Sequence, residues 1–191
     1  YWRWKHLENP FGKSPVLLCW EGDLLIGVRA FMRWEWALQG KVIRAVRAVD
    51  TATHPDHQGK GIFKKLTLSL VDTCTREGDQ FVFNTPNKQS KPGYLKMGWE
   101  EAGKLPVSMR VEKPLSILLN LVKRRPASSD QDRTKINYYL QHTDLESLLV
   151  EHHQQQTKIN TNTSVAYLKW RYGNVPVARY VSIGIEEGPV L

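Results

Sequence analysis

The sequence predicts a mixed α/β domain of the α+β type, with a mostly antiparallel central sheet flanked by helices. Residues Val16–Cys19 and Leu24–Arg33 predict a β-hairpin, because the segment between them, Glu21-Gly22-Asp23, is a turn signal. Residues Lys41–Val49 have the β-branched content and partial alternation of a strand. The spacing of apolar residues then changes from that of a strand to near-helical spacing, with Ile62, Leu66, Leu70 and Cys74 on one face. This spacing predicts an amphipathic helix.

The remaining elements are expected in chain order around this frame. Residues 1–8 are expected to end a helix, and a third strand near Glu35–Leu38 is expected before Gln39-Gly40 turns the chain. The helix that begins after Gly61 is expected to run to Arg76. The other expected strands are Gln80–Phe83, Trp99–Ala102 and Val107–Val111, and the other expected helices are Lys91–Met97, Leu115–Val122 and Leu145–Gln155.

The segment Val49–Thr53 continues the predicted strand Lys41–Val49 and is called the loop strand below. The turn Gln58-Gly59-Lys60-Gly61 connects it to the helix that begins after Gly61. Its two glycines let the backbone adopt strained angles and approach a ligand closely. The first helical turn leaves N–H groups unpaired and carries partial positive charge, so a phosphate or pyrophosphate would find donors there. The spacing fits neither the P-loop nor the dinucleotide fingerprint, and a plain tight turn explains this loop alone equally well.

A second motif follows the strand Gln80–Phe83. The positions of Asn87, Tyr94 and Gly98-Trp99 resemble the Asn...Tyr-x-x-x-Gly-Phe signature of the GNAT superfamily of N-acetyltransferases. The glycine turn resembles the pyrophosphate loop of that superfamily, Gln/Arg-x-x-Gly-x-Gly/Ala, although Asp56 stands where Gln or Arg is usual. The two motifs occur in the order and at about the distance that the superfamily shows.

The resemblance implies an acyl-CoA N-acyltransferase fold that uses acetyl-CoA as the acyl donor and no metal. The loop strand would pair with the pantetheine arm, the loop N–H groups would hold the pyrophosphate, and Asn87 would contact the cofactor arm. Tyr94 would protonate or steady the departing thiolate, which a phenol can do near neutral pH. The implied cofactor-binding residues are Val49, Asp50, Thr51, Ala52, Thr53, His57, Gln58, Gly59, Lys60, Gly61, Ile62, Asn87 and Tyr94.

The catalytic residues have alternative interpretations. Tyr94 is also explained as a buried tyrosine with a satisfied hydroxyl. Asp50 and Glu35, on neighbouring predicted strands, could each polarise a water that takes the ammonium proton, and either could equally be a solvated carboxylate. The amine can also shed its proton to solvent before attack. A zinc site at His54 and His57 is disfavoured because no cysteine lies near them.

The chain repeats itself at a constant offset of 166 residues. Residues 1–10 align without a gap to residues 167–176, and the same offset brings Glu21-Gly22 onto Glu187-Gly188. We therefore expect a fragment of a tandem two-repeat protein. Its predicted parts are an acetyltransferase domain lacking its first strand and helix over 1–113, a helical connector over 114–165, and the start of a second repeat over 166–191.

Composition narrows the partners. The net charge is +8, but the excess of Lys and Arg over Asp and Glu is three, three and two in residues 1–53, 54–113 and 114–191. This even spread disfavours a nucleic-acid footprint. No signal peptide or membrane-length apolar run is visible. Cys19 falls in a predicted strand and Cys74 on a predicted apolar helix face, so both are expected to be buried thiols in a reducing compartment. We expect a cytoplasmic protein whose natural start is missing, with no membrane partner and with a homodimer left open.

Two function hypotheses remain after this step. The leading one is an N-acetyltransferase that moves the acetyl group of acetyl-CoA to a primary amine by direct attack through a tetrahedral intermediate. The alternative is a catalytically silent CoA-binding or scaffold module of a larger tandem protein. The sequence does not identify the acceptor amine.

Overall fold

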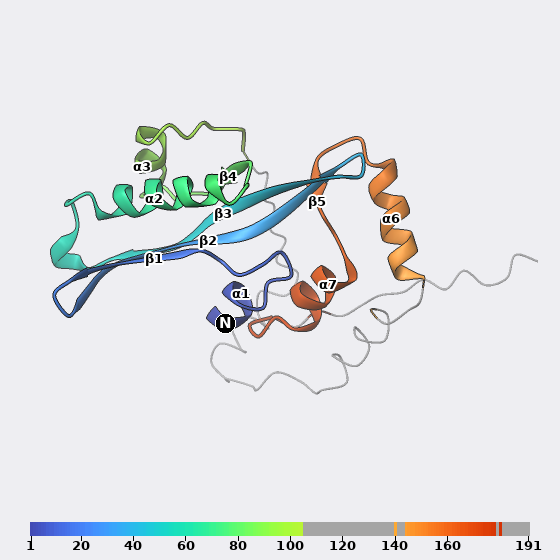
Figure 1. The fold of residues 1–191 in the computed structure, drawn as a ribbon, viewed down its shortest axis with the longest axis horizontal. Coiled ribbons are helices and arrows are strands. Elements are labelled where there is room, and N and C mark those ends of the chain that lie inside the picture. Colours follow the sequence, from blue (N-terminus) through green and yellow to red (C-terminus); the bar gives the residue numbers. More distant parts are fainter. Residues whose placement is uncertain (105–139, 141–143, 179, 181–191) are drawn as a thin grey trace, which may run out of the picture.

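A computed structural model describes residues 1–104, 140, 144–178 and 180 (Figure 1). The strands are β1 (Val16–Glu21), β2 (Leu24–Leu38), β3 (Lys41–Thr53), β4 (Phe81–Phe83) and β5 (Asn160–Thr161). The helices are α1 (Trp2–His6), α2 (Ile62–Arg76), α3 (Lys91–Lys96), α6 (Leu145–Gln155) and α7 (Val165–Leu168), with a 3₁₀ turn η1 (Pro55–His57) and a π-helical segment η2 (Lys169–Gly173).

The strands form one mixed sheet in the order β1-β2-β3-β4, and β5 pairs with β2. All pairings are antiparallel except that of β3 with β4, which is parallel. Helices α2 and α3 cover one face of the sheet, and α1 and α7 lie on the other face (Figure 1). The mostly antiparallel sheet flanked by helices confirms the predicted fold class.

Strand β2 is longer than the sequence suggested. The separate third strand predicted at Glu35–Leu38 is wrong, because β2 continues through these residues and stays in register with β3 up to the pair Leu38↔Lys41. Gln39 and Gly40 then reverse the chain with φ of 49° and 74°. Positive φ at both turn residues is the geometry whose twist matches two paired strands, so the hairpin extends to its tip.

The strand predicted at Trp99–Ala102 is also wrong, since these residues have no strand pairing in the structure. The chain instead leaves α3 through Gly98, with φ of 92°, and folds back on the helix. The N–H of Trp99 donates to the carbonyl of Tyr94, and the two rings pack with centroids 5.4 Å apart. The elements predicted at Val107–Val111 and Leu115–Val122 lie outside the described residues.

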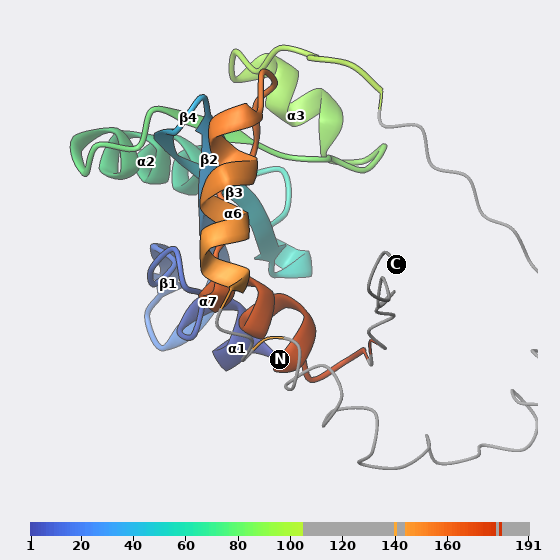
Figure 2. The ribbon, with the colours of Figure 1, turned by 90° about the vertical axis from the view of Figure 1, so that its right-hand side faces the viewer.

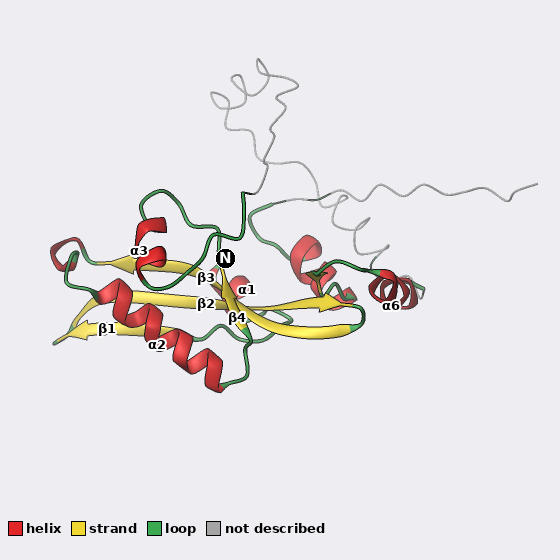
Figure 3. Cartoon of the chain, turned by 90° about the horizontal axis from the view of Figure 1, so that it is seen from above, coloured by secondary structure: helices red, strands yellow, loops and turns green. Residues whose placement is uncertain are grey.

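The sheet has a separate core on each face, because side chains along β2 alternate between them. Odd-numbered Phe31 joins the core under α2 and α3, together with Val46, Leu70 and Cys74. Even-numbered Met32 joins the core against α1 and α7, with Trp4, Tyr167 and Trp170. Figure 3 shows α2 lying over β1 and β2 on the first face. Cys74 is buried there, and burial raises the pKa of its thiol to about 12.

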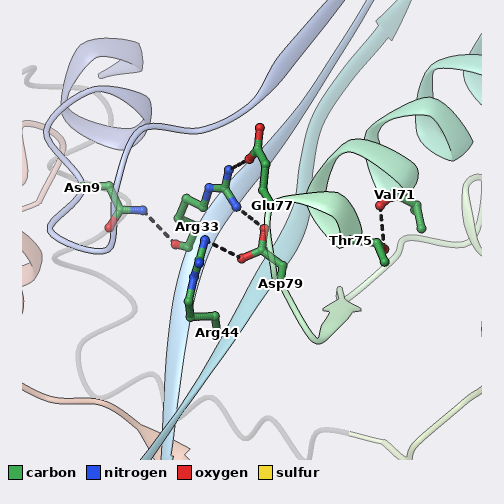
Figure 4. A network of polar contacts seen from close by, with 7 residues as sticks. All are labelled: Asn9, Arg33, Arg44, Val71, Thr75, Glu77 and Asp79. Carbon is green, nitrogen blue, oxygen red and sulfur yellow. Dashed lines mark hydrogen bonds and ion pairs between the residues drawn. The ribbon is translucent and has the colours of Figure 1, made fainter.

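Two features fix the position of α2. At its start, Gly27 of β2 lets the helix approach closely, because a Cβ on Gly27 would come within 2.6 Å of Ile62 Cγ2. Just beyond its end, Arg33 of β2 donates to the carboxylates of Glu77 and Asp79 (Figure 4). Asp79 is almost fully buried, and its Oδ1 also lies 3.6 Å from Nη2 of Arg44 in β3. Ion pairs therefore tie the end of α2 to both β2 and β3.

The C-terminal described segment packs back onto the first 100 residues. The predicted helix over Leu145–Gln155 is confirmed as α6. The expected connector is not purely helical, because β5 adds to the edge of β2 through the pairs Trp36↔Thr161 and Ala37↔Asn160. Helix α7 lies beside α1 (Figure 2). Among the described residues, no helix combines the length and apolar character needed to cross a membrane.

Candidate functional site

The loop between β3 and α2 exposes backbone donors at the start of the helix. Gly59 and Gly61 have φ of 76° and 78°, and a Cβ on either would meet no atom within 4 Å, so the backbone is open to a ligand. Within the described residues, the N–H groups from Gly59 to Lys64 have no backbone acceptor. A helix start with free N–H groups binds anions.

Two of the predicted pyrophosphate donors are not available. The N–H of His57 donates to the carbonyl of His54, and the N–H of Gln58 donates to the carbonyl of Pro55. Both bonds close the 3₁₀ turn η1, which the sequence did not suggest and which Pro55 initiates. The donor set is therefore shorter than predicted, and Lys60, Lys64 and Lys65 fall within it or directly after it in the sequence.

Strand β3 is open on one edge beside this loop. Its parallel pairing with β4 covers only Ala45 to Arg47, whereas β3 continues to Thr53. The backbone of residues 48–53 therefore has no strand partner on the β4 side within the described residues. An extended chain with amide groups could pair there. This is the segment predicted to pair with the pantetheine arm.

A β-bulge interrupts the pairing of β2 with β3 at the same place. Arg29 pairs with Thr51 and Ala30 pairs with Val49, so Asp50 is the extra residue. A bulge turns the strand and re-aims the side chains around it. Here both Val49 and Asp50 contact the α1 face, Val49 within its core and Asp50 through residues of α1.

Tyr94 is buried and is held by a side chain that the sequence analysis did not consider. Arg29 Nη2 donates to the Tyr94 hydroxyl, and Arg29 Nη1 donates to the carbonyl of Val49 at 2.6 Å. Tyr94 is 4% exposed and Arg29 is 1% exposed. The guanidinium lies 5.0 Å from the ring centroid of Phe31 and 5.4 Å from that of Phe63, in the geometry of cation–π contacts.

The charge of Arg29 is therefore enclosed by aromatic rings rather than by carboxylates. Burial lowers the pKa of Arg29, and the nearby Tyr94 and Asp50 oppose this effect. Because Arg29 supplies the proton of its bond to the Tyr94 oxygen, the proton of the phenol stays available for another acceptor. Arg29 thus links the predicted acid directly to the bulge in β3.

Asn87 has a structural role in this chain. Its Oδ1 accepts hydrogen bonds from the N–H of Gln89, from the N–H of Ser90 at 2.8 Å and from the Ser90 hydroxyl. Its carbonyl accepts from the N–H of Lys91, the first residue of α3. Asn87 therefore organises the turn that leads into the helix that carries Tyr94.

Asp50 lies close to the bulge but is already paired. Its Oδ2 lies 2.7 Å from Lys5 Nζ and 2.6 Å from His6 Nε2. Desolvation raises the pKa of Asp50, but the hydrogen bonds and charges of Lys5 and His6 together lower it below its ordinary value. A carboxylate held in this way is a weak base, so the structure gives little support to a direct proton transfer from the amine to Asp50.

Glu35 is far from the bulge, which corrects its predicted place in the site. It lies six residues along β2 from Arg29, about 20 Å at the rise of a strand. Its Oε2 accepts from Asn162 Nδ2 at 2.7 Å, and its carbonyl accepts from the N–H of Asn162. Glu35 therefore ties the C-terminal segment to β2.

Comparisons with protein families and with solved structures both gave matches. A family model described as an acetyltransferase (GNAT) domain matches residues 2–102. No curated protein shows significant similarity to the chain. Among solved structures, an aminoglycoside acetyltransferase from an uncultured soil metagenomic sample is 19% identical, with a TM-score of 0.42, over 52% of this chain and 66% of that one.

Two further solved structures show the same level of similarity. Aminoglycoside N-acetyltransferase AAC(6')-Iy in complex with CoA is 15% identical, with a TM-score of 0.44, over 51% of this chain and 76% of that one. A ribosomal-protein-alanine N-acetyltransferase from Brucella melitensis biovar Abortus 2308 is 19% identical, with a TM-score of 0.43, over 51% of this chain and 71% of that one. The match of the family model covers more than half of the sequence, and the chain therefore belongs to the acetyltransferase (GNAT) domain family.

Proposed function

We propose that this protein transfers the acetyl group of acetyl-CoA to a primary amine by direct attack. The observation that carries the proposal is the link between three parts of one site: the open edge of β3, the bulge carbonyl of Val49 and the buried hydroxyl of Tyr94, joined by Arg29. The pantetheine arm would pair with residues 48–53. The pyrophosphate would be bound by the free N–H groups from Gly59 to Lys64.

The chemical step follows from this placement. The amine attacks the thioester carbon, and backbone N–H groups of the open strand stabilise the charge that develops on the carbonyl oxygen. The tetrahedral intermediate then collapses, the C–S bond breaks, and Tyr94 donates its proton to the departing sulfur. The phenolate that remains is paired with Arg29, and it recovers a proton from solvent as the attacking nitrogen releases its extra proton to solvent and becomes the amide. Since Asp50 is a weak base, the amine enters the site after losing its proton to solvent.

Binding of acetyl-CoA and loss of turnover in Tyr94→Phe together test the proposal. Isothermal titration should detect acetyl-CoA binding by the wild-type chain and by the variant with similar affinity, because the phenyl ring keeps its packing. Release of free CoA with an amine acceptor should fall by about 100-fold in the variant, the size of a general-acid contribution. A folded wild-type chain that shows no binding would refute the proposal.

The alternative, a silent CoA-binding or scaffold module, is favoured by one observation: neither predicted base is free and in place. Asp50 is paired with Lys5 and His6, and Glu35 is bonded to Asn162. The two functions differ in their response to amine acceptors. A silent module would bind acetyl-CoA and release no CoA with any acceptor, in the wild type as in Tyr94→Phe.

A further inference from the structure

A cavity of about 430 Å³ lies on the α1 face of the sheet, away from the glycine loop. Helix α1 contributes Trp4 and Lys5, and the sheet contributes Arg47 and Val49. The opposite wall comes from the second copy of the sequence repeat and the residues after it, namely Trp170, Arg171, Val175, Val177, Ala178 and Tyr180. The cavity therefore exists only where the two ends of the described chain meet.

The cavity reaches the reaction centre through one residue. Val49 lines the cavity, and its carbonyl accepts the hydrogen bond of Arg29, whose other nitrogen holds Tyr94. Tyr94 packs in the core on the α2 face, whereas Val49 packs in the core on the α1 face. A molecule in the cavity would thus meet the open strand from the face opposite to Tyr94.

Two arginines in the cavity wall lack a carboxylate partner within the described residues. Arg47 donates to Thr85 Oγ1 at 3.1 Å, and Arg171 donates to the Tyr180 hydroxyl at 2.8 Å. Lys5 differs, because Asp50 already neutralises it. A pair of guanidinium groups without a counter-ion favours an anion, and the guanidinium fork matches a carboxylate in geometry.

Apart from Lys5, the rest of the wall consists of apolar and aromatic side chains. Trp4 and Trp170 are 8% and 5% exposed, and Trp34 also lines the space. Arg171 is itself held in place, since its guanidinium lies 5.4 Å from the ring centroid of Tyr172 and 5.6 Å from that of Tyr180. A site of this size with a few polar groups on aromatic walls suits a small molecule with one apolar part.

We propose that this cavity is the acceptor site and that the acceptor is a primary amine bearing a carboxylate and an apolar side chain, the chemistry of an apolar α-amino acid. Arg47 and Arg171 hold the carboxylate, and the indoles contact the side chain. The assignment rests on the proposed acetyl transfer. It gives the second repeat a direct part in choosing the acceptor.

Matched acceptors test the charge requirement. Leucine, methionine, phenylalanine and tryptophan are compared with their amides, and with O-phosphoethanolamine, at a pH where all the amines are largely deprotonated. We expect each acid to exceed its amide in kcat/KM by about tenfold or more, the value of one charge-assisted hydrogen bond. Amides that equal the acids, or phosphoethanolamine ahead of every acid, would overturn the assignment.

Variants test the two residues. Arg47→Gln and Arg171→Gln should each raise KM for the acid by about tenfold, while KM for the amide and affinity for acetyl-CoA stay unchanged. Arg76→Gln is the matched control, because Arg76 is exposed on α2 and pairs with Asp72. If both wall variants keep the wild-type KM, Arg47 and Arg171 do not bind the acceptor.

Binding of the product provides a readout that needs no turnover. Calorimetry should show that N-acetylphenylalanine binds the wild-type chain more tightly than its amide, and that Arg47→Gln removes the difference. Equal binding of acid and amide counts against the acceptor class alone. A chain that binds no acetyl-CoA counts against the acetyl transfer itself, so the two failures are distinguishable.

Discussion

The side chains of Trp4 and Trp170 exchange hydrogen bonds with each other's backbone. Each indole Nε1 donates to the other residue's carbonyl oxygen at 2.8 Å. The rings stack with centroids 4.5 Å apart and planes 11° from parallel. The two residues are separated by 166 positions, the offset of the sequence repeat, and a reciprocal contact of this kind is what a local two-fold axis produces.

The neighbouring residues repeat the same relationship. Tyr1 packs on Trp4 with ring centroids 5.3 Å apart, and its repeat counterpart Tyr167 packs on Trp170 at 6.0 Å. We infer that the repeated motifs are held together by equivalent contacts. That the chain is a fragment of a tandem two-repeat protein stays a prediction.

The tryptophan pair should act as one energetic unit. Trp4→Ala and Trp170→Ala should each lower the free energy of unfolding by about 3–5 kcal/mol, because a buried ring is lost. The double variant should cost less than the sum by about 1 kcal/mol, since each single change already removes the stacking. Urea unfolding of the four proteins measures this coupling. Strict additivity would contradict it, and Trp20→Ala, at an exposed tryptophan of β1, is the control.

Arg29 should matter for turnover more than for stability. Arg29→Met roughly keeps the side-chain volume and removes a buried charge. The free energy of unfolding should therefore fall by at most about 1 kcal/mol, or increase. Turnover should fall about tenfold, because Tyr94 loses the bond that positions its hydroxyl. Steady-state kinetics and urea unfolding measure both effects.

A second variant separates positioning from packing. If Arg29 acts through Tyr94, Arg29→Met in a Tyr94→Phe background should cause no further loss of turnover. Arg29→Lys should recover part of the rate, since an ammonium can still donate to the hydroxyl. Independent losses in the double variant would show that Arg29 acts elsewhere.

The sequence predicted the hairpin, the glycine turn and α2 because each is encoded by local residues. The periodicity of Ile62, Leu66 and Leu70 needs no tertiary information. The bonds of Arg29 and Asp50 depend on a bulge and on packing between distant segments, which local pattern does not specify. One signal was present in the sequence, however. Arg29 alternates with Gly27 and Phe31 along the strand, so it shares their face of the sheet, and a charged side chain on a face that packs against a helix is unusual.

Gly61 should be required for cofactor binding because of its backbone conformation. Gly61→Ala forces a side chain into φ of 78°, at a cost of roughly 1 kcal/mol, and should weaken CoA binding as the loop shifts. Gly61→Asn should lose less, since asparagine tolerates this region. Gly22→Ala is the matched control, because Gly22 has φ of 57° with equal free space but lies in the β1–β2 turn. Calorimetry that shows equal losses would contradict a local role.

Gly27 should be required for the placement of α2. In Gly27→Ala the new methyl meets Ile62 Cγ2 at 2.6 Å and Leu66 Cδ1 at 3.2 Å, so the helix start must move. We expect a loss of about 1–3 kcal/mol in the free energy of unfolding and weaker CoA binding. Ile62→Ala removes the nearest methyl group. It should therefore lower the free energy of unfolding less in the Gly27→Ala background than in the wild type. Thermal and urea unfolding report the coupling.

His6 should make stability depend on pH just below its ordinary pKa of 6.5. Burial lowers the pKa of His6 in the folded chain and Lys5 adds to this, while the hydrogen bond and charge of Asp50 oppose it. The unfolded chain therefore binds a proton first as the pH falls through 6.5, and the free energy of unfolding decreases. Asp50 adds a loss at lower pH, beginning near its ordinary value of 3.8, because its pKa is also lowered.

Replacing the histidine tests this assignment. His6→Gln should remove the part of the slope that begins at 6.5 and leave the loss at acidic pH, where Asp50 and the other carboxylates titrate. His152→Gln, at an exposed histidine of α6, should leave the whole profile unchanged. Urea unfolding from pH 7.5 down to about pH 3 covers the loss due to His6 and the onset of the loss due to Asp50. A wild-type slope that survives in His6→Gln would mean that another group takes up the proton.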